Sequence, residues 1–223
     1  MPWRGGGHVG HELAEYYEHR ASEYDSIYQK PERQADLTAL KTQLRELFSG
    51  RKVLEVAAGT GYWTQVIAPM AASVLATDLN SGPLNTAKIR DYGGAAVDFQ
   101  VADAFELGKI QGEFNAAFAG FWWSHLSLDQ VPRFVDGLAQ RLPSGSLVVA
   151  IDNRYVPENS TPIARRDAAG NTYQQRVLSD GGTWEILKNF PEPDALRRSV
   201  LAYSEDVSVH LLTYYWVLRF TLR

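Results

Sequence analysis

The spacing of hydrophobic residues changes near residue 51 of this chain. Before that point, apolar and aromatic side chains recur every three or four residues, first in residues 12–28 and then in residues 31–50. This spacing predicts two amphipathic helices. Pro31 suits the first position of the second helix, where its missing N–H is not needed, and Gly50 is typical of a helix end.

Short apolar runs alternate with helical segments from residue 51 onward. Strands are predicted near residues 52–57, 73–78, 96–101, 114–120 and 146–152. Helices are predicted between them, near residues 62–70, 82–91 and 128–142. The alternation indicates parallel strands joined by right-handed crossovers, with helices on both faces of the sheet. Ligands of such sheets bind beyond the carboxyl ends of the strands.

The last third of the chain has a different pattern. Residues 156–172 are rich in proline, asparagine, glycine and charge, which predicts a loop or a small lid. The pair Gly181-Gly182 separates two strand-like runs, 173–178 and 183–190, and predicts a β-hairpin. The remaining expected elements are a helix over 193–203 and one long last strand over 207–222.

Composition and charge exclude several classes of protein. The chain has 223 residues, a formal net charge of −4 and no cysteine. Its length fits one domain with a large core. The absence of cysteine excludes disulfides, thiolate nucleophiles and cysteine-based metal sites. A negative charge without a clustered basic face argues against nucleic-acid binding. No apolar run approaches the roughly 20 residues that cross a bilayer, and the N-terminus has no signal-peptide core, so we expect a cytoplasmic protein without membrane contact.

A glycine turn follows the first predicted strand, within residues 53–64. An apolar strand that leads into glycines and then a helix presents backbone N–H groups to a nucleotide-like ligand. Gly59 and Gly61 allow the ligand to approach the backbone closely. Asp78 follows the second strand, where a carboxylate can accept both ribose hydroxyls. Asp103 follows the third strand, where it can accept from an adenine amine while the Ala104 N–H donates to a ring nitrogen.

The run from Leu54 to Gly61, followed by Asp78 and then Asp103, resembles the class I S-adenosylmethionine-dependent methyltransferases. Asp78 lies 17 residues after Gly61, and Asp103 lies 25 residues after Asp78, so each interval has room for one helix and one strand. The resemblance implies an α/β, Rossmann-like fold. Its expected features are a seven-stranded, mostly parallel sheet with an antiparallel last strand, helices on both faces, an N-terminal helical cap or lid over residues 1–50, and a core over residues 51–223 with a loop or hairpin insertion at about 153–190.

The resemblance also implies S-adenosyl-L-methionine as cofactor and S-adenosyl-L-homocysteine as product. In the family, the acid matching Glu55 lies near the methionine ammonium of the cofactor. A tyrosine of the N-terminal lid, here Tyr24, places its hydroxyl near the cofactor carboxylate. The expected cofactor-binding residues are Tyr24, Glu55, Ala57, Gly59, Gly61, Asp78, Leu79, Asp103, Ala104 and Gly120.

Many family members shape the acceptor site with the segment that follows the fourth strand, here residues 120–125. His125 either takes a proton from the acceptor or is a helix-start residue with a satisfied ring. Trp122 and Trp123 are expected to divide between an aromatic or cationic acceptor pocket and the core. The expected substrate-binding residues are Tyr16, Trp122, Trp123, Tyr155 and Arg176, and no metal site is expected.

These features predict an enzyme that transfers a methyl group, by in-line displacement, to nitrogen or oxygen of a small aromatic or heteroaromatic metabolite. Two alternatives stay open. An NAD(P)-dependent oxidoreductase would carry a third glycine where this chain has Thr64. A catalytically silent module would bind the cofactor without transferring its methyl group. We expect a monomer or a homodimer with a small-molecule substrate.

Overall fold

The computed structural model describes residues 24–177 and 181–223. Most of the first predicted helix, residues 12–23, therefore lies outside the described residues. The helices are η1 (Tyr24–Gln29), η2 (Pro31–Arg33), α2 (Gln34–Phe48), α3 (Tyr62–Ile67), α4 (Ser81–Lys88), η3 (Leu107–Lys109), η4 (Trp123–His125), α5 (Gln130–Arg141) and α6 (Pro193–Val200), of which those labelled η are 3-10 helices.

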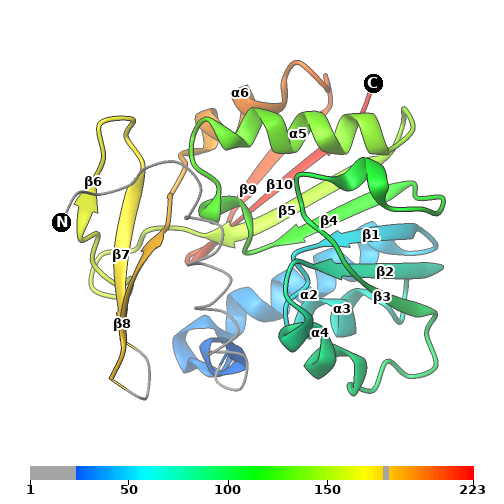
Figure 1. Ribbon diagram of the computed structural model, residues 1–223, viewed down its shortest axis with the longest axis horizontal. Helices are drawn as coiled ribbons and strands as arrows, with labels where there is room; N and C mark the ends of the chain where they lie inside the picture. The colour runs from blue at the N-terminus through cyan, green and yellow to red at the C-terminus, as the bar shows by residue number, and fades with distance from the viewer. Residues whose placement is uncertain (1–23, 178–180) are drawn as a thin grey trace.

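A seven-stranded sheet forms the centre of the fold, with the strand order β3-β2-β1-β4-β5-β10-β9 (Figure 1). Its strands are β1 (Lys52–Val56), β2 (Ser73–Asp78), β3 (Val97–Val101), β4 (Ala116–Gly120), β5 (Leu147–Asn153), β9 (Val207–Leu211) and β10 (Tyr215–Thr221). Strands β1 to β5 are parallel, whereas β10 is antiparallel to both β5 and β9. This confirms the predicted mostly parallel sheet with an antiparallel last strand. The strand order reverses between β1 and β4, so the ligand crevice of this fold lies beyond their carboxyl ends.

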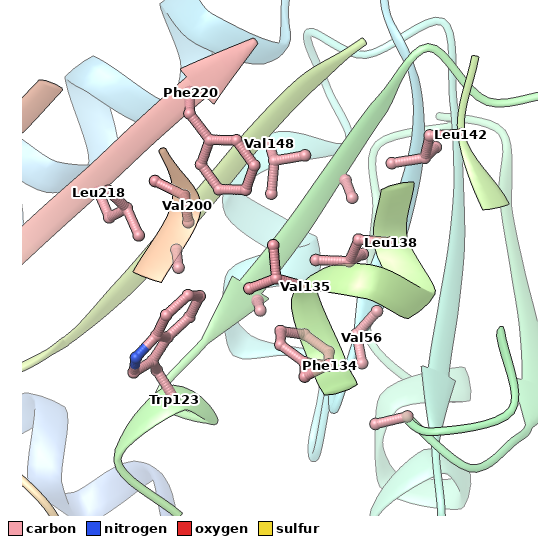
Figure 2. Close-up of a cluster of buried hydrophobic side chains, with 14 of the residues drawn as sticks. Val56, Trp123, Phe134, Val135, Leu138, Leu142, Val148, Val200, Leu218 and Phe220 are labelled. Atoms are coloured by element: carbon pink, nitrogen blue, oxygen red, sulfur yellow. The ribbon is translucent and has the colours of Figure 1, made fainter. Parts of the chain in front are cut away.

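Alternate residues of the central strands face two separate hydrophobic clusters. On one face, Leu54 and Val56 of β1 pack with α5 and α6. Figure 2 shows part of this cluster, in which Val135 and Leu138 of α5 lie near Val148 of β5. On the other face, β1 packs with buried residues of α2 and α3. Helices therefore cover both faces, as predicted.

Helix α2 belongs to the second of these clusters. Its apolar side chains Leu37, Leu40, Leu44 and Phe48 recur every three or four residues and are buried. The Phe48 ring meets Phe118 of β4 edge to face, with ring centroids 5.5 Å apart. Each fully buried side chain of this size contributes about 1.5–3 kcal/mol, so α2 is fixed firmly on the sheet. The division of the chain into a cap of residues 1–50 and a core of 51–223 stays a prediction.

A second, smaller sheet contains β6 (Arg165–Arg166), β7 (Thr172–Val177) and β8 (Thr183–Leu187), and Figure 1 shows it to the left of the main sheet. Its antiparallel β7–β8 pair confirms the predicted hairpin. Strand β6 lies within residues 156–172, which the sequence pattern predicts as a loop. Two residues of strand are too short to produce an alternating pattern.

The prediction of one long strand over residues 207–222 is wrong. The segment contains two antiparallel strands, β9 and β10, with a turn between them that is closed by the Leu212 N–H donating to the Tyr215 carbonyl at 2.9 Å. The turn has neither glycine nor proline, so the usual sequence signal for a hairpin is missing.

Within residues 24–177 and 181–223, no helix combines the length and apolar character needed to cross a membrane.

Candidate functional site

The glycine turn lies after β1, where the sheet order reverses. Gly59 and Gly61 have left-handed φ angles of 57° and 77°. A Cβ at Gly59 would meet no atom within 4 Å, so this side of the turn is open to a ligand. A Cβ at Gly61 would lie 2.8 Å from the Cβ of Ala87 in α4. Gly59 therefore leaves room for a ligand, and Gly61 lets the turn pack against α4. Ala57 also has a left-handed φ, of 55°, which is strained for a residue with a side chain.

Asp78 at the end of β2 holds the glycine turn in place. Its carboxylate accepts the N–H of Gly59 and the N–H of Asn80, each at 2.9 Å. Burial raises the pKa of Asp78 above its ordinary value, although these backbone donors act in the opposite direction. Each oxygen keeps a second lone pair, so the carboxylate can still accept the two hydroxyls of a ribose.

Glu55 is a buried acid inside β1 whose carboxyl lacks a hydrogen bond at one oxygen. Its exposed fraction is 1%, and Oε2 has no hydrogen-bond partner within the described part of the chain. Burial raises the pKa of Glu55 to about 8, and the charge of Asp78 contributes in the same direction. A buried acceptor without a donor is costly, so this position suits a ligand that brings a donor or a positive charge.

The third predicted acid, Asp103, lies just after the end of β3. Asp103 accepts the N–H of Phe105 at 2.8 Å, which fixes the turn after β3. Ala104 beside it is buried. Leu79, which follows Asp78, has 51% of its surface exposed although it is a large apolar side chain. A flat aromatic group bound between the ends of β2 and β3 would cover it.

An ion pair joins the glycine turn to the N-terminal segment. Asp25 of η1 accepts from the Thr60 hydroxyl at 2.8 Å and from the guanidinium of Arg90. Arg90, which follows α4, also donates to the Thr60 carbonyl. The sequence does not predict a role for these three residues, because the two contacts join positions 35 and 65 residues apart and leave no local sequence pattern.

A strained backbone turn follows β4. Phe121, directly after Gly120, has a φ of 60°, which is rare for a bulky residue. Its N–H donates to the Ile151 carbonyl at 2.8 Å, and its ring packs against Trp63 and Tyr215. These contacts stabilise the left-handed conformation of Phe121. Such strain gathers at functional sites, and here it sets the direction of the segment that carries Trp122 to His125.

A buried ion pair connects this segment to the small sheet. The Lys188 ammonium lies 3.0 Å from the Asp152 carboxylate at the end of β5 and donates to the Ser124 hydroxyl at 2.6 Å. The Ser124 N–H donates to the other Asp152 oxygen at 2.9 Å. Burial acts to raise the pKa of Asp152, but the charge of Lys188, the interaction with His125 and the hydrogen bonds from Ser124 together outweigh burial and lower it below the ordinary value. Lys188 lies in the predicted 183–190 strand, and nothing in its neighbourhood in the sequence indicates this role.

His125 lies beside that ion pair with a buried ring. Its Nδ1 lies 2.9 Å from the Leu187 carbonyl oxygen, so Nδ1 carries the proton and donates. Burial, together with the positive charges of Lys188 and Arg176, lowers the pKa of His125 to about 3. The ring is therefore neutral across the physiological range. Its expected action as a general base stays a prediction.

The two tryptophans after β4 lie in different places. Trp123 is 3% exposed and packs in the core against Phe134 and Trp216 (Figure 2 shows it beside α5). Trp122 is partly buried, and its ring meets Phe105 and Phe134.

A pocket of about 110 Å³ lies between the small sheet and the carboxyl ends of β4 and β5, and we name it the hairpin pocket. Neither tryptophan lines it. It includes His125 and the predicted substrate residue Arg176. Its lining residues are Ile27, Lys30, Arg33, Phe121, His125, Asn153, Asn159, Ser160, Thr161, Gln174, Arg176, Ile186, Lys188 and Phe190.

The other predicted acceptor residues lie apart from the pocket or outside the described residues. Tyr155 is 40% exposed, and its ring meets Phe190, which lines the pocket. Tyr16 and the side chain of Tyr24 lie outside the described residues. In the part of the chain that the structure describes, no three His, Asp or Glu side chains group as a metal site would require.

The cleft suits S-adenosylmethionine on its own geometry. It offers an open glycine backbone, acids at the ends of β2 and β3, and a buried carboxyl at Glu55 that lacks a donor. The cofactor has the matching groups: an ammonium, a ribose and an adenine.

Comparisons with known proteins agree with this cleft. A family model described as a methyltransferase domain matches residues 53–145, which contain the glycine turn and both aspartates. The chain is 29% identical over 145 residues to a demethylmenaquinone methyltransferase of Clavibacter sepedonicus. That match covers 62% of this chain and spans only 57% of the length of the relative.

Solved structures extend the similarity to nearly the whole chain. A complex of DhpI with SAH has a TM-score of 0.76 and 25% identity, and the match covers 96% of this chain and 97% of DhpI. A 1,6-didemethyltoxoflavin-N1-methyltransferase of Burkholderia thailandensis, solved with its acceptor and S-adenosylhomocysteine, has a TM-score of 0.66 and 16% identity, over 100% of this chain and 92% of that one. At this identity the second match shows the fold alone. The fold, the cleft and these matches together support a class I S-adenosylmethionine-dependent methyltransferase.

Proposed function

We propose that this chain transfers the methyl group of S-adenosylmethionine to nitrogen or oxygen of a small molecule bound in the hairpin pocket. One observation carries the proposal: the pocket begins at Phe121, directly after Gly120 at the end of β4, next to the edge of the sheet that carries the glycine turn. An acceptor in the pocket and a cofactor in the cleft would therefore be neighbours.

The cleft residues have separate roles in holding the cofactor. Glu55 would pair with the methionine ammonium, Asp78 would accept from the ribose, and Asp103 with Ala104 would bind the adenine. The bound sulfonium supplies a methyl group that is already activated for displacement. The protein then mainly aligns acceptor and donor, which accounts for much of the rate of such reactions.

The acceptor is a small molecule in this proposal. Aromatic contact would come from Phe121 and Phe190, which line the pocket, rather than from the predicted tryptophans. The Burkholderia thailandensis relative is named for N1-methylation of 1,6-didemethyltoxoflavin, and this name supports a small acceptor. With a pKa of about 3, His125 is a weak base at neutral pH, so an acceptor that arrives deprotonated fits this site best.

The proposal is tested by transfer from S-adenosylmethionine with a labelled methyl group to a panel of small nitrogen and oxygen acceptors. We expect labelled product and S-adenosylhomocysteine in equal amounts. Titration with nicotinamide cofactors tests the oxidoreductase alternative, for which tight binding would be required. If the chain binds S-adenosylmethionine and the whole panel stays unlabelled, the silent module is the better account.

A further inference from the structure

Cationic side chains are concentrated in the hairpin pocket. Lys30, Arg33, Arg176 and Lys188 line it, and no Asp or Glu of the described ranges does so. The whole chain carries a net charge of −4, so this concentration does not follow from composition. One of the four, Lys188, is already balanced by the buried carboxylate of Asp152. Lys30, Arg33 and Arg176 add further positive charge to the lining of the pocket.

Neutral groups hold the guanidinium of Arg33 in the pocket wall. It donates to the amide oxygens of Asn159 at 2.7 Å and Asn153 at 3.4 Å. It also lies over the rings of Tyr214 and Tyr215, at 5.2 and 5.8 Å from their centroids. Its Nε is buried and makes no hydrogen bond within residues 24–177 and 181–223. Neutral amides and aromatic rings thus fix the Arg33 charge in position.

The acids nearest to Arg33 in the sequence do not line the pocket. Glu32 is exposed and accepts from the Asn159 side chain at 3.0 Å. Asp36 is buried and accepts the Tyr214 N–H at 2.7 Å. Neither carboxylate forms a salt bridge with Arg33.

Arg176 enters the pocket from the small sheet. It donates to the Gln174 amide oxygen at 2.7 Å and to the Thr161 hydroxyl. Besides burial, the positive charges of Lys188 and Arg176 lower the pKa of His125, whereas the charge of Asp152 acts in the opposite direction. Arginine binds carboxylate and phosphate oxygens in pairs, and a partly buried site strengthens this recognition.

We propose that the hairpin pocket recognises an oxyanion, a carboxylate or phosphate group of the acceptor, through Arg33 and Arg176. This inference rests on the proposed function, since it describes the substrate of the same site. It selects small anionic acceptors over neutral analogues of the same shape. The apolar residues Phe121, Ile186 and Phe190 then contact the remainder of the molecule.

Binding of small anions to the protein saturated with S-adenosylhomocysteine tests the inference. The probes are inorganic phosphate and acetate, with acetamide as the neutral analogue of acetate, measured by calorimetric or NMR titration at constant ionic strength. We expect at least one anion to bind and acetamide to bind more weakly. A charge-assisted hydrogen bond is worth about 1.5–3 kcal/mol, so Arg33→Gln and Arg176→Gln should each weaken anion binding by about tenfold or more.

Matched variants separate recognition from folding. Arg33→Lys and Arg176→Lys keep the charge and should lose less affinity than the glutamine variants. Arg165→Gln is the control, because Arg165 lies on the same small sheet but is exposed and paired with Glu185 at 2.6 Å. It should leave anion binding unchanged. The affinity for S-adenosylhomocysteine, measured on each variant, reports whether the cofactor cleft is intact.

The outcomes are distinct for the two proposals. If S-adenosylhomocysteine binds while acetate, phosphate and acetamide all bind equally or not at all, the oxyanion inference is overturned and the proposed methyl transfer stands. Anion binding that both glutamine variants retain in full would overturn it too. If S-adenosylhomocysteine itself does not bind, the proposed function fails first.

Discussion

Glu55 and His125 are both buried, and burial holds each of them in its neutral form. For Glu55 the pKa is raised to about 8, so the acid is protonated near neutral pH without a ligand. For His125 the pKa is lowered to about 3, so the imidazole is neutral. A bound ammonium would reverse the state of Glu55, whereas nothing in the cofactor opposes the state of His125. The two residues therefore predict different dependences on pH.

Cofactor binding should release protons through Glu55. Near pH 7 the ammonium of S-adenosylhomocysteine favours the carboxylate, so Glu55 loses its proton on binding. Calorimetric titrations in two buffers of different ionisation enthalpy measure this release. We expect a buffer-dependent heat that is reduced in Glu55→Gln. The same buffer dependence in the variant as in the natural chain would contradict the role of Glu55.

His125 should make the protein less stable in acid. The unfolded histidine binds a proton below pH 6.5, whereas the folded ring does so only near pH 3. The free energy of unfolding therefore falls as the pH drops from about 6.5 toward 3, by up to about 1.4 kcal/mol per pH unit. Urea unfolding across this range should show a shallower slope for His125→Gln. The exposed His210 gives a control, and a His210→Gln variant should keep the original slope.

Gly59→Ala should reduce cofactor affinity beyond its effect on folding. Gly59 and Gly145 both have left-handed φ angles, 57° and 79°, and at both a Cβ would meet nothing within 4 Å. Alanine in this conformation costs about 1–2 kcal/mol at either position. Only Gly59 faces the cleft, so only Gly59→Ala should weaken S-adenosylhomocysteine binding strongly. Equal affinities of the two variants would remove Gly59 from the cofactor site.

The sequence predicts the positions of some site residues, whereas others are recognised only in the folded chain. The glycines and the acids at Asp78 and Asp103 follow from strand ends and spacing alone. The left-handed turn at Phe121 does not, because a bulky aromatic residue gives no signal for a positive φ. The ion pair of Asp152 with Lys188 joins positions 36 residues apart, and only the folded chain brings them together.

At the scale of elements, the small sheet is joined to the main sheet through its last residues. The Asn189 N–H donates to the Ser124 carbonyl at 2.7 Å, and the Asn189 amide donates to the Leu126 carbonyl at 2.9 Å. Lys188 adds the buried ion pair with Asp152. The hairpin is thereby fixed over the segment after β4, and it forms one wall of the hairpin pocket.

Lys188→Met should destabilise the protein by about 3–5 kcal/mol, because it leaves the Asp152 carboxylate buried without its cation. The double variant Asp152→Asn with Lys188→Met removes both charges and should recover most of that loss. Urea unfolding measures both. Lys52→Met, which breaks an exposed pair with Glu113 at 3.0 Å, should have no measurable effect. A Lys188→Met variant as stable as the natural chain would show that the ion pair does not hold the hairpin.

Elements with a strong hydrophobic period are the ones that the sequence predicts well. Helix α5, predicted over 128–142, spans Gln130–Arg141, and β1, predicted over 52–57, spans Lys52–Val56. The short strand β6 and the turn between β9 and β10 are missed. Both are decided by antiparallel pairing with the next strand in the sequence rather than by local composition.

At the scale of the whole molecule, the order of elements determines where the chemistry lies. Parallel strands with right-handed crossovers bring the ends of β1, β2, β3 and β4 to one edge, which is why the cofactor cleft can be predicted from strand ends. The hairpin pocket needs five separate segments: η1 with η2, the turn after β4, the end of β5, residues 159–161 and the small sheet. No single sequence pattern spans them, so Arg33 and Lys188 emerge only from the fold.

The central claim is that the cleft after β1 binds S-adenosylmethionine, and calorimetric titration of the purified chain with S-adenosylhomocysteine tests it most directly. We predict saturable binding at micromolar ligand with one site per chain, weakened in Gly59→Ala and retained in Gly145→Ala. No detectable binding of S-adenosylhomocysteine or S-adenosylmethionine up to millimolar concentration, by a chain that is folded and unfolds cooperatively, would contradict it.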